Sequence, residues 1–121
     1  MEYQWQTILG QPPSKSNTYR VVTIHGHGSL AKTPATKAYE NSFYMQMGAY
    51  RNLNIEGYFE LHMRVYFASM SHDIDNSAKV VLDCLQNGKA IKNDNRCVKL
   101  TAEKFIDKLN PRIEFKITTI E

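Results

Sequence analysis

Three aspartates and a lysine lie close together in residues 71–85, SHDIDNSAKVVLDCL, and Asp94 precedes a later apolar stretch. One residue separates Asp73 from Asp75. Carboxylates that converge repel one another unless a cation lies between them. Mg²⁺ suits that position because it prefers carboxylate oxygens and fills its other positions with water and substrate phosphate. The pattern therefore indicates phosphate chemistry, in which Lys79 offsets negative charge on the transition state.

Hydrophobic periodicity predicts the elements that position these residues. Alternating apolar residues over 57–69 predict a strand with one buried face. An apolar pattern at helical spacing then predicts a helix from about residue 76 to 87, closed by an Asn-Gly stop signal. Asp75, Lys79 and Asp83 lie one above another on such a helix. The first aspartate of the group then lies at the strand's exit, which makes a shared site plausible.

Each of these residues also has an ordinary structural interpretation. Asp75 fits the N-cap of the helix. Lys79 fits a surface ion pair with Asp75 and Asp83. Asp73 and Asp94 fit turn positions. The joint arrangement, and not any single residue, favours a site, because two carboxylates at a strand exit and a third before the next strand can converge.

Other metal and phosphate motifs fit the chain less well. A calcium loop starting at Asp73 needs Gly and Glu where the chain has Ala78 and Cys84. DIDNS is similar to the D-x-D-x-T/S element of haloacid-dehalogenase-type phosphotransferases, but the chain is too short for their doubly wound domain. His25 and His27 lack a third ligand and fit a loop.

The remaining elements follow from the rest of the chain. Apolar and aromatic residues recur at helical spacing over 35–53 and predict a helix whose Tyr39, Phe43, Met47 and Tyr50 face the core. Gly, Ser, Thr and Pro in residues 25–34 predict a loop. Further strands are expected at 5–9, 19–24, 96–106 and 112–120. The order predicts an α+β fold, with two helices on a mixed or largely antiparallel sheet.

Composition bounds the protein class. The chain has 121 residues, 42% hydrophobic and 22% charged, which predicts one ordinary globular domain spanning 1–121. No apolar run approaches the roughly 20 residues that cross a bilayer, and no secretory signal is evident, so the cytoplasm is the expected compartment. The two cysteines form no metal motif and are expected to be reduced. A net charge of +3 suits a polyanionic partner.

The stretch DIDNSAKVVLDCLQNGKAIKNDNRCVKL resembles the signature of RusA-type Holliday-junction resolvases, which are common in bacteria and their prophages. The family pattern is D-x-D-N-x-x-K-x-x-x-D-x-L, followed by a Gly-containing connection and an acidic pair. Asp73, Asp75, Asn76, Lys79, Asp83, Leu85 and Asp94 occupy it in register. The opening PPSKSNTYR also resembles the family's P-P-S-x-N-x-x-Y-R, so the resemblance spans about residues 8 to 120.

Two positions depart from the family pattern. Asn93 stands where many members have the first Asp of an acidic pair, which leaves Asp94 as the expected ligand. Ser16 replaces the expected Asn of the opening motif, with Asn17 one place later.

The resemblance implies that Asp73, Asp75 and Asp94 bind Mg²⁺, that Lys79 is catalytic, and that the chain dimerises. Asp83 is expected to orient Lys79 or the helix, with Asn76 as a further supporting residue.

The expected function is Mg²⁺-dependent hydrolysis of four-way DNA junctions, in recombination, repair or phage DNA processing. Paired nicks require two sites, which a twofold homodimer supplies through the first helix or a sheet edge. Phosphate contacts are expected to provide the affinity. The candidate DNA-binding residues are Lys15, Arg20, Lys32, Lys89, Lys92 and Arg96. Two alternatives remain, a catalytically silent module that binds branched DNA and a small-molecule phosphohydrolase.

Overall fold

Four strands form one mixed sheet in this computed structural model, which describes residues 1–14, 19–24 and 26–120. β1 and β4 both pair antiparallel with β6, whereas β4 and β5 run parallel. In spatial order the strands are β1 (Gln6–Leu9), β6 (Arg112–Thr119), β4 (Phe59–Phe67) and β5 (Cys97–Ile106). Together with two helices this sheet confirms the predicted α+β class.

The central strand β4 shows why the sequence pattern is reliable there. Phe59, Leu61, Met63, Val65 and Phe67 are all buried, and the residues between them are partly exposed. Successive side chains of a strand point to opposite faces, so this alternation covers one face of the sheet with core residues and leaves the other open. The predicted strand is confirmed.

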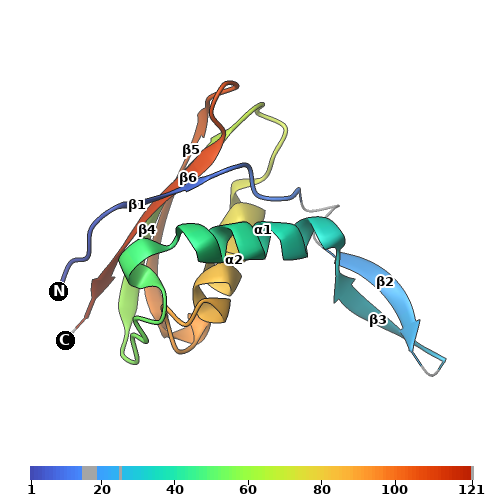
Figure 1. Ribbon diagram of the computed structural model, residues 1–121, viewed down its shortest axis with the longest axis horizontal. Coiled ribbons are helices and arrows are strands. Elements are labelled where there is room, and N and C mark those ends of the chain that lie inside the picture. Colours follow the sequence, from blue (N-terminus) through green and yellow to red (C-terminus); the bar gives the residue numbers. More distant parts are fainter. Residues whose placement is uncertain (15–18, 25, 121) are drawn as a thin grey trace.

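The helix α1 (Pro34–Gln46) lies across the apolar face of the sheet (Figure 1). Thr33 caps it by accepting a hydrogen bond from the backbone N–H of Thr36 at 3.2 Å. The predicted core stripe of this region is confirmed, because Tyr39, Phe43, Met47 and Tyr50 are all buried.

The predicted continuation of α1 to residue 53 is wrong. The α-helix ends at Gln46 and is followed by a short 3-10 turn, Gly48–Tyr50. Gly48 has φ +59°, in the left-handed region that favours glycine. A Cβ at this position would lie 2.9 Å from Oε1 of Gln6, so the Gln6 side chain would have to shift if any other residue stood there.

The predicted loop over residues 25–34 is also wrong. Residues His27–Lys32 form strand β3, which pairs antiparallel with β2 (Tyr19–Ile24) as a separate two-stranded hairpin. The hairpin extends beyond the first turn of α1, away from the main sheet (Figure 1). Val21 and Leu30 face each other across it and are 75% and 70% exposed. None of the hairpin side chains that the structure describes is buried, so the segment lacks the polar and apolar alternation that marks a strand.

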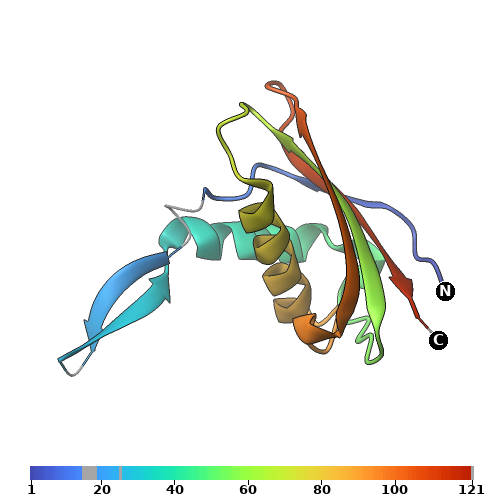
Figure 2. The same cartoon turned by 180° about the vertical axis from the view of Figure 1, so that it is seen from behind.

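The second helix, α2 (Ile74–Asn87), connects the parallel strands β4 and β5. Its buried residues, including Val81 and Leu85, join the core formed with the sheet. In both ribbon views α2 begins beside the end of β4 and returns to the start of β5 (Figures 1 and 2). The two ends of α2 therefore lie at opposite ends of these strands. No helix among the described residues is long and apolar enough to cross a membrane.

Candidate active site

Asp73 and Asp75 lie at the beginning of α2. The helix starts at Ile74, two residues earlier than predicted, so Asp73 occupies the N-cap position and Asp75 lies in the first turn. Asp73 makes no side-chain cap hydrogen bond, whereas Oδ1 of Asp75 accepts one from the backbone N–H of Asn76 at 2.9 Å. Both carboxylates are exposed, and the positive end of the helix dipole favours negative charge there.

Lys79 and Asp83 follow Asp75 at intervals of four residues on α2, as predicted. Lys79 is exposed and forms no ion pair with any described residue. Asp83 is partly buried. An ammonium one turn from the aspartates is available to an anion bound at the start of the helix.

Asn76 anchors the first turn of α2 to a distant segment of the chain. Its side-chain Nδ2 donates to the backbone carbonyl of Pro13 at 3.1 Å. This contact fits the supporting role expected from the sequence, because it holds the aspartate-bearing turn against residues 11–14.

Asp94 lies at the other end of α2. It begins a 3-10 turn, Asp94–Arg96, immediately before β5, and its backbone N–H donates to Oε1 of Gln86 at 2.9 Å. Asn93 caps this turn by accepting from the backbone N–H of Asn95 at 3.0 Å. An Asn in place of the family's first Asp therefore has a local structural use in this chain.

The three carboxylates do not meet within one chain. The 14 residues of α2 between them span roughly 20 Å at about 1.5 Å per residue. Within the described part of the chain, no group of three or more His, Cys, Asp or Glu side chains is close enough to hold a metal ion. The sequence predicted that the three carboxylates converge, but α2 connects two parallel strands. The end of β4 and the start of β5 therefore lie at opposite ends of this helix.

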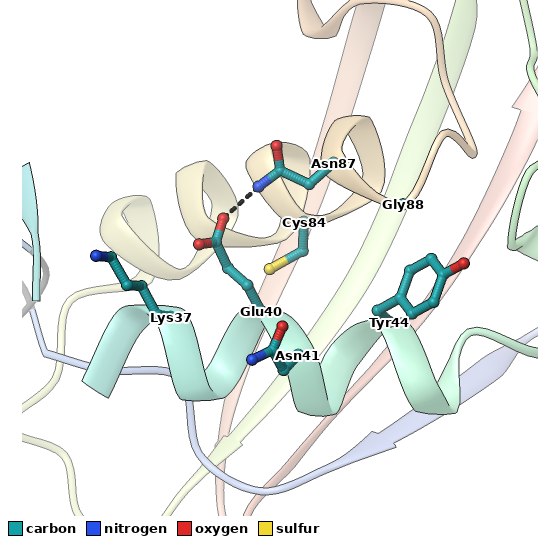
Figure 3. Close-up of a pocket in the computed structure, with 7 residues that line it drawn as sticks. All are labelled: Lys37, Glu40, Asn41, Tyr44, Cys84, Asn87 and Gly88. Atoms are coloured by element: carbon teal, nitrogen blue, oxygen red, sulfur yellow. Dashed lines mark hydrogen bonds between the residues drawn. The ribbon is translucent and has the colours of Figure 1, made fainter. Parts of the chain in front are cut away.

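Lys32, a candidate DNA-binding residue, forms an ion pair. Its Nζ lies 2.7 Å from Oε2 of Glu40, and the same oxygen accepts a hydrogen bond from Asn87 at the end of α2 (Figure 3). The contact joins the base of the hairpin to both helices. A groove of about 360 Å³ runs beside it between α1 and α2. Burial raises the pKa of the Cys84 thiol in this groove, which disfavours the thiolate form that a nucleophile needs.

Three other basic candidates lie beyond the end of α2. Lys89 and Lys92 are exposed, and the guanidinium of Arg96 lies 5.4 Å from the ring centre of Tyr58. These three residues flank Asp94 in the sequence that connects α2 to β5. The remaining candidates are Lys15, which lies outside the described residues, and Arg20, which lies in β2.

The two histidines for which the sequence offers no partner have one in the structure. His62 Nε2 lies 2.7 Å from Oε1 of Glu103 on the open face of the sheet. His72 Nε2 lies 3.0 Å from Nε2 of Gln11. Because these partners are 41 and 61 residues away in sequence, no local sequence pattern predicts the contacts.

The family model described as Endodeoxyribonuclease RusA matches residues 10–118. The chain belongs to the RusA family. Membership indicates an endodeoxyribonuclease that resolves Holliday junctions, and the match covers both helices and the strands from β2 onward except the last residue of β6. No curated protein matches the chain.

Proposed function

We propose that this RusA-family chain is a Mg²⁺-dependent endonuclease that resolves four-way DNA junctions by paired phosphodiester hydrolysis. The observation that supports this most strongly is the family match over residues 10–118, within which Asp73 and Asp75 are exposed at the start of α2. Those residue types at that position suit phosphate hydrolysis.

The donor set fits a hard divalent cation. Asp73 has an exposed carboxylate that makes no capping hydrogen bond, and carboxylate oxygen is the ligand that Mg²⁺ prefers. When bound, the ion would lower the pKa of a water ligand and polarise the scissile phosphate. Asp73, Asp75 and Asp94 are the proposed ligands.

Lys79 is the proposed partner of the reacting phosphate. One helical turn from Asp75, its ammonium offsets the negative charge that develops on the phosphate oxygens. Asp83, a further turn along, is proposed to orient this lysine or the helix, although no ion pair joins the two side chains in the described chain. Asn76 keeps the first turn of α2 in place through its hydrogen bond to Pro13.

The proposed site is completed by a second copy of the chain. A twofold axis perpendicular to α2 places the α2 helices of the two copies antiparallel, so the end of one α2 can approach the start of the other. Asp94 of the partner would then join Asp73 and Asp75. A homodimer of this kind contains two equivalent sites, which matches the paired nicks that junction resolution requires.

DNA binding is proposed to depend on phosphate contacts near these sites. If the cation neutralises three of the twelve carboxylates, nine remain against fifteen Lys and Arg residues. The resulting positive field attracts the DNA backbone, and binding should weaken steeply with added salt. Lys15, Arg20, Lys32, Lys89, Lys92 and Arg96 are the proposed contacts.

One assay separates the proposed function from its two alternatives. Wild-type protein is incubated with a synthetic four-way junction, a linear duplex of the same sequence and a chromogenic phosphate ester, in Mg²⁺ and then in EDTA. The proposal expects cleavage of the junction alone, and only with Mg²⁺. Hydrolysis of the ester without junction preference favours the small-molecule phosphohydrolase.

The variant Asp73→Asn tests for a silent binding module. It should bind the junction as the wild type does but lose cleavage by at least about a hundredfold, because a metal ligand is lost. A wild-type protein that binds junctions without any Mg²⁺-dependent cutting would contradict the enzyme proposal and support the binding module.

A further inference from the structure

The connection between β4 and α2 is an irregular segment that carries Asp73. Residues 68–73 form bends and turns without helix or strand, and they end in the N-cap aspartate. Such a segment has no ladder of backbone hydrogen bonds to fix its path. The position of Asp73 therefore depends on whatever other contacts the segment makes.

Gln11 holds this connection at two points. Its Oε1 accepts from the backbone N–H of Ala68 at 2.8 Å, and its Nε2 lies 3.0 Å from Nε2 of His72. The first contact orients the amide, so its nitrogen must donate to His72. His72 Nε2 is then the acceptor, and its proton lies on Nδ1. The imidazole also stacks on Phe67, with ring centres 4.8 Å apart and planes at 11°.

Lys104 holds the same connection from the opposite side. This β5 residue donates from Nζ to the backbone carbonyl of Met70 at 2.8 Å and also to the carbonyl of His72. Its ammonium lies 5.7 Å from the ring centre of Phe67. Two side chains from distant parts of the sequence thus fix residues 68, 70 and 72, which immediately precede Asp73.

We infer that Gln11 and Lys104 are positioning residues for the carboxylate of Asp73. The inference rests on the proposed nuclease function, in which that carboxylate binds the metal ion. Metal ligands depend on neighbouring hydrogen bonds for their orientation, and loss of such a contact typically lowers affinity or activity by about 10- to 100-fold. Neither residue touches the metal or the DNA in this account.

The chain contains a matched control for Gln11. Gln46 makes a similar bridge, because its Oε1 accepts from the backbone N–H of Leu9 at 2.7 Å and its Nε2 donates to the carbonyl of Leu9. This bridge joins α1 to β1 and makes no contact with residues 68–73. Gln46→Met therefore removes comparable hydrogen bonds without affecting the connection before Asp73.

The kinetic test compares Gln11→Met with Gln46→Met under single-turnover conditions, with the protein in excess over the junction and at a saturating concentration. Gln11→Met should lower the single-turnover cleavage rate at least about tenfold and raise the Mg²⁺ concentration that gives half the maximal rate. Its junction affinity should change less than about twofold, because phosphate contacts are retained. Equal cleavage by both variants would overturn the inference. Lys104→Met should behave as Gln11→Met does, and Lys104→Arg should recover most of the rate.

A spectroscopic test remains informative if the wild type cuts no DNA. The ring nitrogen shifts of His72 in wild-type protein at about pH 8 should show a proton on Nδ1 and none on Nε2, as the bridge from Gln11 requires. In Gln11→Glu the carboxylate accepts where the amide donated, so the proton should move to Nε2. An unchanged tautomer would refute the bridge from Gln11 to His72. A changed tautomer with inactive wild type would instead contradict the proposed function.

Discussion

Two inactive variants should restore cleavage when they are combined in one dimer. Asp73→Asn removes a ligand at the start of α2, and Asp94→Asn removes one at its end, roughly 20 Å away in the same chain. If each site takes Asp73 from one copy and Asp94 from the other, a mixed dimer contains one site with both substitutions and one site with neither.

The expected size of the recovery follows from counting sites. Equal amounts of the two variants that exchange freely give about half mixed dimers, each with one of two sites intact. About one quarter of the wild-type sites are then functional. The nicking rate should recover to about a quarter of the wild-type rate, whereas paired cleavage of one junction should not, because no dimer has two functional sites.

The assay is nicking of a labelled four-way junction by equal amounts of the two variants, co-expressed with different affinity tags. Mixed dimers purified through both tags each have one of two sites intact, so they should nick at about half the wild-type rate. The matched control combines Asp73→Asn with Asp75→Asn, which alter the same end of α2 and leave every site defective in a mixed dimer. Recovery in the control, or none in the test pair when mixed dimers are present, would refute a site shared between two copies.

Three further predictions concern stability and reactivity. Tyr39→Phe should raise the free energy of unfolding in urea by about 1 kcal/mol, since the buried Tyr39 hydroxyl has no hydrogen-bond partner in the described structure; destabilisation would contradict this. The hydrogen bond from His62 lowers the pKa of Glu103. The ionised Glu103 therefore contributes its full stabilisation above pH 4.5, the usual pKa of the group, and this stabilisation is lost as the pH falls through the lower pKa of the folded protein. The stability difference between wild type and Glu103→Gln should therefore vanish in acid, and a difference independent of pH would show that the pair is not responsible. Burial raises the pKa of both cysteines, but Cys84 is buried whereas Cys97 is partly exposed. A thiol reagent should therefore label Cys97 first in the native protein and Cys84 after unfolding, as read by mass spectrometry. Equal native labelling rates would argue against this packing.

The elements with a buried face were predictable from the sequence. β4 alternates buried and exposed residues along its whole length, and α2 repeats apolar residues at helical spacing. In both elements the side-chain period is the physical signal, because one face packs on the core. The start of α2 was misplaced by two residues because Asp75 and Asp73 are both good residues for an N-cap position.

The hairpin and the end of α1 depend on features that periodicity does not report. β3 has exposed side chains such as Leu30, and its Gly28 is typical of loops, so its composition does not distinguish it from a turn. Gly48, just after the end of α1, has a left-handed backbone angle and lies against the side chain of Gln6. That contact involves a residue more than forty positions away.

The candidate site was predictable in its residue types but not in its geometry. The motif around Asp73 identified aspartates at a strand exit, and the structure has them there at the head of α2. Their distance from Asp94 depends on β4 and β5 being parallel, which a prediction of a mixed or largely antiparallel sheet did not specify. The contacts of Gln11 and Lys104 arise from tertiary packing and leave no local pattern in the sequence.

A metal site shared between two copies of the chain is tested most directly by the binding of Mn²⁺, a paramagnetic substitute for Mg²⁺, followed by NMR. A single cation shared by two copies should broaden the amide signals of Asp73, Asp75 and Asp94 together, although the two ends of α2 are roughly 20 Å apart within one chain. Asp73→Asn should then reduce the broadening at Asp94 as well. Broadening confined to one end of α2 in the wild type would contradict a site built from all three carboxylates.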